Sequence, residues 1–366
     1  MNVVSWIMAL FAVVGAFDCI IGNKLGLGKE FEKGAHLLGP MMLSMVGMLV
    51  LTPLFTTLLE PCIAGMTGIL DPSTIPALLF ANDMGGASMS VSVANNEMVG
   101  KFNALVVSSM MGVTFSFTIP YALGVVKKEK QDAMFLGFLC GIVTIPVGCL
   151  IGGLILGLPI LTILVNLLPL IVICIIIAIG LLKAPNLCIK FFSVFGVIIK
   201  ALVTIGLAIG IFQTVTGWNV VPYVGTVLEA GNIIVSIACV LCGAFPFIHL
   251  LSKFLKKPIA YLGKKVGLDF KDSVGIVSTL ASSAPTFGLM DEMSEKGIIV
   301  NSAFTISGAF IVGSHMAFTL AFSADCLAAV LIGKFLAGIA AIVVAVWISN
   351  RQKLDLCVEL LQERNF

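Results

Sequence analysis

Long apolar segments dominate the sequence. Eleven of them, each 19 to 26 residues long, occupy approximately residues 3–21, 36–59, 73–94, 101–126, 133–157, 159–182, 190–214, 230–252, 272–291, 297–322 and 326–348. A helix needs about 20 apolar residues to span the hydrocarbon core of a bilayer. With 59% hydrophobic and only 11% charged residues, the chain is predicted to be an all-α polytopic membrane protein. No basic stretch precedes the first segment, which is expected to be a retained span.

Two of the apolar segments are interrupted by polar and helix-breaking residues. Segment 73–94 contains NDMGG at residues 82–86, and segment 272–291 contains ASSAPT at residues 281–286. Hydrocarbon offers no water to unpaired backbone groups or charges, so such interruptions are tolerated mainly where they line a site. Both segments are therefore predicted to be re-entrant or broken helical hairpins.

A weak internal repeat relates the two halves of the chain. The aligned residues are Pro53 and Pro246, Asp71 and Asp269, Asn82-Asp83 and Ser282-Ser283, Asn103 and Asn301, and Ser109 and Ser307. The predicted organisation is a transmembrane repeat 1 over 1–157 with its hairpin at 73–94, a linker helix over 158–189, a transmembrane repeat 2 over 190–348 with its hairpin at 272–291, and a cytoplasmic tail over 349–366.

The distribution of positive charge favours about nine crossing helices plus the two hairpins. If each hairpin enters and leaves on one side, 18 of the 21 Lys and Arg residues fall on one face, and the opposite face holds only Lys101. Cytoplasmic loops carry an excess of Lys and Arg, so the N-terminus is predicted outside and the C-terminus inside. The halves then form inverted repeats, which are typical of secondary transporters with sites at the repeat interface.

The two hairpin tips carry complementary polar groups. Asp83 is predicted to bind the ammonium of a small organic cation, with Asn82 as a further polar contact, and Gly85 and Gly86 are predicted to free the backbone around it. The alternative is that Asp83 only holds its hairpin together. The second tip offers the Ser282 and Ser283 hydroxyls and a helix-breaking Pro285, which suit a neutral polar group. A ligand with an ammonium at one end and a hydroxyl at the other would satisfy both tips.

Five further residues complete the predicted site. Asn103 and Asn301 follow the hairpins at equivalent positions and either support the ligand or simply cap or pack a helix. His315 either contacts the hydroxyl or packs in its helix. Lys200 and Lys334 are placed near the bilayer centre, where a lysine needs a partner, and are expected to have structural roles, such as pairing with carbonyls or balancing Asp83.

Other classes of function find little support. There is no catalytic pair, no metal-ligand spacing and no sign of a cofactor, which argues against a membrane enzyme, and no soluble domain suggests a scaffold or receptor. The net charge of +2 arises at predicted membrane ends and does not indicate nucleic acid. The expected partners are the small-molecule substrate and membrane lipid, with a homo-oligomer as an open possibility. The main alternative to alternating access is an uncoupled facilitator or channel, and the sequence does not identify a coupling ion.

Several stretches resemble the ethanolamine utilisation permease family, EutH. They are GAFDCII at 15–21, LSMVGM at 43–48, DMGG at 83–86, GIVTIPVGC at 141–149, LVTIGLA at 202–208 and GKF at 333–335. The likeness runs from about residue 5 to 348. It implies a protein of the bacterial cytoplasmic membrane that imports ethanolamine for catabolism by a cobalamin-dependent ammonia lyase elsewhere.

Overall fold

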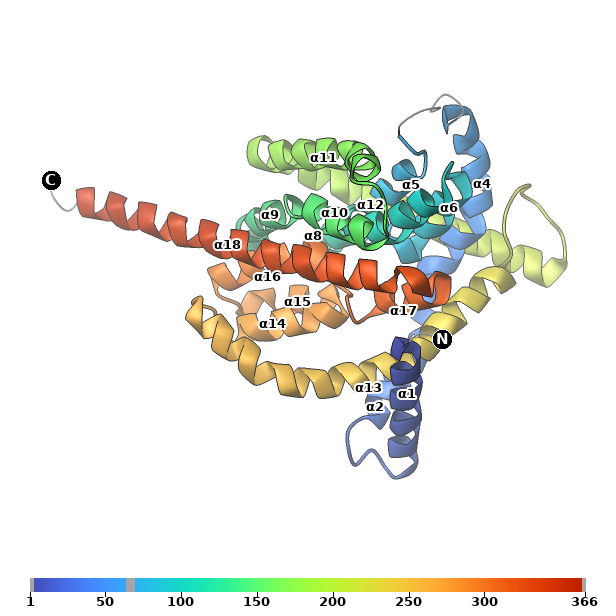
Figure 1. Cartoon of the computed structure of the whole chain (residues 1–366), viewed down its shortest axis with the longest axis horizontal. Helices are drawn as coiled ribbons and strands as arrows, with labels where there is room; N and C mark the ends of the chain where they lie inside the picture. Colours follow the sequence, from blue (N-terminus) through green and yellow to red (C-terminus); the bar gives the residue numbers. More distant parts are fainter. Residues whose placement is uncertain (1–2, 64–69, 364–366) are drawn as a thin grey trace.

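The computed structural model describes residues 3–63 and 70–363, and this part of the chain is helical with no strand (Figure 1). The elements of the first half are α1 (Val3–Ile20), α2 (Gly28–His36), α3 (Leu38–Met41), η1 (Met42–Val46), α4 (Gly47–Ile63), α5 (Thr74–Leu79), η2 (Asn82–Met84), α6 (Gly86–Val93), α7 (Glu97–Lys101), η3 (Phe102–Gly112), η4 (Thr114–Thr118), α8 (Ile119–Val125), α9 (Lys128–Ile142) and α10 (Ile145–Ile155).

The second half is also helical in the part that the structure describes. Its elements are α11 (Ile160–Lys183), α12 (Pro185–Thr216), α13 (Val227–Lys265), α14 (Phe270–Ala281), α15 (Ser283–Leu289), η5 (Met290–Glu292), α16 (Glu295–Gly308), α17 (Ser314–Phe322), η6 (Ala324–Cys326) and α18 (Leu327–Glu363). α18 crosses the molecule and continues without a break past the predicted start of a tail at residue 349 (Figure 1).

Seven helical runs in the described part of the chain are long and apolar enough to cross a membrane. They are Val3–Ile20, Glu97–Val125, Lys128–Ile155, Ile160–Lys183, Asn186–Thr216, Val227–Leu251 and Ala324–Arg351. Two further runs, 38–63 and 295–322, are long enough but contain π-helical or non-helical interruptions. The two segments expected to be hairpins are broken into shorter helices. The predicted all-α polytopic membrane fold is thus confirmed.

The helical runs that follow the two hairpins form the centre of the molecule. Every residue of η3 is buried, and so is every residue of α16 from Lys296 to Gly308. Outer helices such as α1 and α11 instead expose apolar side chains, as expected for contact with lipid. Small residues let α10 and α18 approach closely: a Cβ on Gly148 would lie 2.7 Å from the Gly333 carbonyl oxygen, so a larger residue would not fit there.

The first hairpin is closed at its base by Asp71. The Asp71 carboxylate accepts hydrogen bonds from the backbone N–H of Ser73, where the chain enters α5, and from those of Asn95 and Asn96, where it leaves α6, at 3.0 to 3.1 Å. One buried carboxylate therefore holds both ends of the segment together. The segment enters and leaves at the same place, as a re-entrant hairpin must.

Asp272 does the same for the second hairpin. Its carboxylate accepts from the N–H of Asp269 before α14 at 2.9 Å, and from the N–H and hydroxyl of Ser294 after η5 at 3.1 and 2.7 Å. Asp272 therefore has the role in the second hairpin that Asp71 has in the first, whereas the sequence alignment paired Asp71 with Asp269, three residues earlier.

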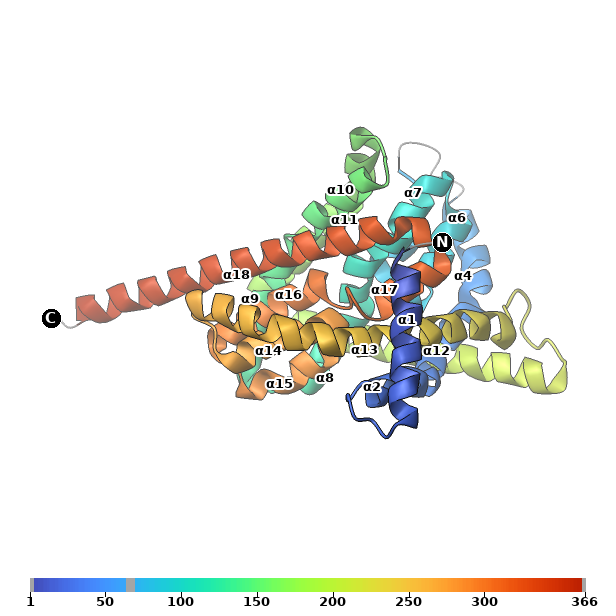
Figure 2. The same cartoon turned by 60° about the horizontal axis from the view of Figure 1, so that its bottom comes forward.

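The two hairpin bases lie at opposite ends of one helical run. The run Glu97–Val125 begins directly after the first hairpin, and Lys101 near its start forms an ion pair with Asp325 at 3.6 Å. Just beyond its other end, Lys127 pairs with Asp291 of the second hairpin at 2.9 Å. The run is about 40 Å long at roughly 1.5 Å per residue. α6 and the α14–α15 pair accordingly lie on opposite sides of the molecule in both views (Figures 1 and 2). An inverted repeat requires this arrangement, although the repeat itself stays a prediction.

Replacement of Asp71 by Ala should destabilise the fold without touching the hairpin tip. The change leaves three backbone N–H groups without their charged acceptor, so we expect a loss of about 3 kcal/mol in the free energy of unfolding. Thermal unfolding in detergent would report this as a fall of several degrees in the apparent Tm. Asp132→Ala, which removes an exposed carboxylate, should leave the Tm unchanged; an equal effect of both variants would contradict the assigned role of Asp71.

Candidate functional site

The tip of the first hairpin is an ordered break in the helix. The backbone is extended at Phe80 and Ala81, turns through the short η2, and reaches α6 through Gly85, whose φ of +89° is a left-handed conformation suited to glycine. Side-chain hydroxyl groups form hydrogen bonds with backbone groups that the break leaves without a helical partner. Ser108 donates to the Phe80 carbonyl at 2.6 Å, and Ser116 accepts from the Ala81 N–H at 3.0 Å. The Gly/Ser-rich run of η3 and η4 thus supplies the partners that hydrocarbon lacks.

The second tip is completed by a break in a neighbouring helix. α14 ends at Ala281, and Ser282 is extended and caps α15 by accepting from the Ala284 N–H. Next to it, the chain between α16 and α17 leaves the helix at residues 309–313. Two of its N–H groups, those of Phe310 and Val312, donate to the Thr279 and Leu280 carbonyls at 3.1 and 2.9 Å.

The two tips meet at a cavity of about 400 Å³. Asp83 and Met84 of the first tip line it together with Ala281, Ser282 and Ala284 of the second. The rest of its wall includes Phe310, Ser314 and His315 from the α16–α17 break, Val113 and Phe117 from the helical run Glu97–Val125 (the central run), and Leu241 and Phe245 from α13. The Asp83 side chain is 14% exposed, so its carboxylate opens onto this cavity while the rest of the tip is packed.

Neutral side chains that can form hydrogen bonds lie beside the Asp83 carboxylate. The Ser314 hydroxyl lies beside its carboxylate, and both residues line the same cavity. The Nε2 atom of His315 lies 3.9 Å from Asp83 Oδ1, too far for a hydrogen bond but close enough for a bridging ligand, and the buried Nδ1 atom of His315 has no partner. The carboxylate therefore keeps acceptor capacity for a cationic donor.

A buried lysine is linked to the same polar centre. Lys334 of α18 is fully buried and donates to the backbone carbonyl of Ser109 in η3. The same carbonyl lies near His315, and the charges of Lys334 and Asp83 are opposite and close enough to attract each other. Residues from both halves of the chain thus meet at one polar centre beside the cavity.

Several of the predicted residues lie away from the cavity. Asn82 and Ser283 are buried beside the tips without hydrogen-bond partners, but they do not line the cavity. Asn103 donates to the Ser73 and Thr74 hydroxyls, and Asn301 to the Asp272 carbonyl, at 2.8 to 3.1 Å. Both asparagines therefore fasten hairpin bases. Pro285 is exposed in the first turn of α15, where a missing N–H is tolerated.

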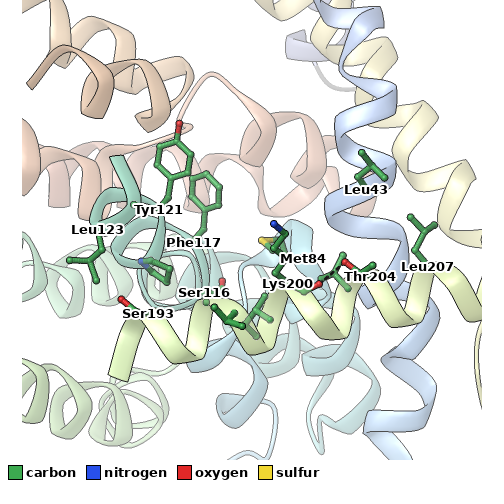
Figure 3. Close-up of a pocket in the computed structure, with 16 residues that line it drawn as sticks. Leu43, Met84, Ser116, Phe117, Tyr121, Leu123, Ser193, Lys200, Thr204 and Leu207 are labelled. Atoms are coloured by element: carbon green, nitrogen blue, oxygen red, sulfur yellow. Dashed lines mark hydrogen bonds between the residues drawn. The ribbon is translucent and has the colours of Figure 1, made fainter. Parts of the chain in front are cut away.

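Lys200 lines a second cavity of about 730 Å³ between α12 and the η4–α8 segment (Figure 3). Its side chain is exposed, unlike that of Lys334. The wall is mostly apolar, and Met84 and Phe117 belong to both cavities. The two lysines expected to be alike thus have different surroundings, and only Lys334 reaches the polar centre.

Phe310 lines the cavity but was not singled out from the sequence. Phe310 has a φ of +62°, which is an outlier for a bulky residue and marks a strained break. Its ring lies 4.8 Å from the His315 ring and 5.9 Å from that of Phe117, centroid to centroid. The only sequence signal was Gly308 and Gly313 on either side of it, and a helix rich in small residues does not reveal where it breaks.

A methyl group at Gly86 should disrupt the first tip. A Cβ there would lie 2.3 Å from the Phe80 carbonyl oxygen and 2.5 Å from Ser108 Oγ, so Gly86→Ala should lower the free energy of unfolding by at least about 1 kcal/mol. Gly288 in α15 is a matched control because nothing lies within 4 Å of a Cβ there. Gly288→Ala should leave the Tm in detergent unchanged or slightly raised. If Gly86→Ala were equally harmless, the close packing of this tip would be refuted.

Comparison with known proteins gives one consistent result. A family model described as "Ethanolamine utilisation protein, EutH" matches residues 1–348. The chain is 39% identical over 352 residues to the probable ethanolamine permease EutH of Listeria monocytogenes, covering 96% of this chain and 94% of the relative. It is 34% identical over 391 residues to the protein of that name from Escherichia coli, covering 96% of both chains. An uncharacterized Bacillus subtilis protein, YxeR, is 36% identical over 353 residues, which are 96% of this chain and 95% of that one.

No solved structure matches the chain. The family model matches nearly the whole sequence, and relatives are 34 to 39% identical over about 96% of its length. These matches are sufficient to assign the chain to a family. The chain therefore belongs to the EutH family of ethanolamine utilisation proteins.

Proposed function

We propose that the protein is a transporter that imports ethanolamine across the bacterial cytoplasmic membrane by alternating access. Relatives of the chain are named probable ethanolamine permeases, which supports a role in transport and not in catalysis. The observation that carries the proposal is the Asp83 carboxylate, which opens onto a cavity between two hairpin tips inside an otherwise apolar membrane protein.

The ammonium of ethanolamine binds to Asp83 in this proposal. Taking an ammonium out of water is costly unless a charged partner and several acceptors replace the water. Asp83 supplies the charge, and Ser314 supplies a hydroxyl oxygen beside it. The rings of Phe310, Phe117 and Phe245 line the same cavity and can face the cation.

The hydroxyl of ethanolamine binds on the side of the second tip. Ser282 and His315 line the cavity there, and a hydroxyl can donate to one of them and accept from the other. The second tip carries no charge, so it does not compete for the ammonium. This difference between the tips orients a ligand that has a cation at one end and a neutral polar group at the other.

Two features support alternating access over an open channel. The site lies between two hairpins whose bases are at opposite ends of the central run, so movement of either hairpin would open the cavity to a different side. The α16–α17 break is held to α14 by only two backbone hydrogen bonds, at 3.1 and 2.9 Å. An N-terminus outside and a C-terminus inside remain part of the proposal, as do the inverted repeats.

Replacement of Asp83 by Asn should abolish ethanolamine binding. The amide preserves the shape of the side chain but removes the charge that compensates the ammonium, so the affinity should fall at least about 30-fold. The measurement is a calorimetric titration of the purified protein in detergent. Asp132→Asn, at an exposed position, should bind as the wild type does. Wild-type affinity in the Asp83 variant would remove this residue from the site.

Counterflow separates alternating access from a facilitating pore. Proteoliposomes loaded with unlabelled ethanolamine and diluted into a trace of labelled ethanolamine should accumulate label transiently above the outside concentration. A carrier exchanges the two pools through one site, whereas a pore lets each flow down its own gradient. Absence of the overshoot, with ethanolamine uptake retained, would favour the facilitator.

A further inference from the structure

Lys334 is the one feature of the polar centre that a binding site for a cation does not explain. It lies in the middle of a run of small and apolar residues in α18, directly after Gly333, which packs closely against Gly148 of α10. Its ammonium is completely buried and bonds to the Ser109 carbonyl. A positive charge at this place repels the cation that Asp83 is proposed to bind.

The groups that act electrostatically on Lys334 come from three other elements. They are the Asp83 carboxylate of η2, the Cys149 thiol of α10 and the His315 imidazole of α17. The fourth contact, with η3, is the neutral Ser109 carbonyl. Among these, the carboxylate is the natural counter-charge of the ammonium when the cavity holds no cation.

Binding of a cationic substrate changes the net charge of the polar centre. With Asp83 negative and Lys334 positive, the polar centre is neutral. A bound ethanolammonium would add a third charge, and a net positive charge in a low-dielectric interior is strongly disfavoured. The single negative charge of Asp83 balances only one of the two ammonium groups. The imbalance is removed if one proton leaves.

We propose that Lys334 is a tethered counter-cation of Asp83 that loses its proton when substrate binds, so that one proton is exchanged for each ethanolammonium. This inference rests on the proposed function. When substrate binds, an N–H bond of the Lys334 ammonium breaks, the electron pair stays on the nitrogen, and the proton passes to water on the side from which the substrate came. When substrate leaves on the other side, Lys334 takes up a proton there.

One full cycle moves one ammonium inward and one proton outward. No net charge crosses the membrane, so uptake should follow the pH difference and not the membrane potential. An acidic interior should accelerate it, because Lys334 is then reprotonated quickly on the inner side. Consumption of ethanolamine inside a cell would keep such an exchange running inward.

The first test uses the full-length wild type in proteoliposomes with labelled ethanolamine. An inside-negative potassium diffusion potential set with valinomycin should change the initial uptake rate less than two-fold, whereas an interior one pH unit more acidic should raise it several-fold. Uptake that rises several-fold with the potential would overturn the inference. It would leave the proposed function standing, whereas a wild type that neither binds nor transports ethanolamine would remove the proposed function itself.

Two substitutions of Lys334 distinguish a lysine that loses its proton from a lysine with a structural role alone. Lys334→Arg keeps a charge that cannot be lost at ordinary pH, so ethanolamine affinity should fall at least tenfold. Lys334→Gln removes the charge but keeps a donor for the Ser109 carbonyl, so binding should persist and uptake should become dependent on potential. Lys183→Gln, at an exposed position of α11, should behave as the wild type does.

Proton release provides a readout that does not depend on transport. Ethanolamine added to the wild type in weakly buffered detergent solution with a pH indicator should release about one proton for each molecule bound, and Lys334→Gln should release none. Release by the Gln variant equal to that of the wild type would assign the proton to the substrate amine and overturn the role of Lys334. Normal binding by the Arg variant would overturn it as well, and neither result would affect the role of Asp83.

Discussion

The lack of water in the hydrocarbon core of a membrane is the constraint on which this structure depends. Each break in a helix exposes N–H and C=O groups that must find partners within the chain. The breaks at residues 80–85 and 309–313 are tolerated because Ser108, Ser116 and the α14 carbonyls satisfy them. The same requirement explains why buried Asp71 and Asp272 lie where backbone N–H groups converge. These buried carboxylates therefore serve as acceptors for the backbone.

Asp83 is the exception to that pattern, and its chemistry follows from the difference. The carboxylates at the two hairpin bases, Asp71 and Asp272, accept from backbone donors, whereas Asp83 faces a cavity with hydroxyl and imidazole groups beside it. The opposing tip contributes hydroxyl groups and no charge. The two hairpins are alike in how they are built and different in what they present, which suits a ligand with two unlike ends.

Sequence reasoning succeeded where a local pattern was sufficient. Glycines, a proline and a carboxylate within an apolar run indicated both hairpins, because helix breaks in a membrane need such residues. For Asn103 and Asn301 it left ligand support and helix packing as alternatives, because their contacts depend on which way the helix faces. Phe310 and the Ser109 carbonyl were missed for a related reason. The residue type does not indicate the strained φ of Phe310 or the use of the Ser109 backbone carbonyl as an acceptor.

The account depends most on where a substrate lies, and a cryo-electron microscopy structure of the protein in lipid nanodiscs with saturating ethanolamine tests this directly. We expect density for the ligand in the cavity between Asp83 and Ser282, with the ammonium within about 3 Å of the Asp83 carboxylate. Density beside Lys200 in the second cavity, with none at Asp83, would contradict the account, as would an Asp83 carboxylate that faces lipid.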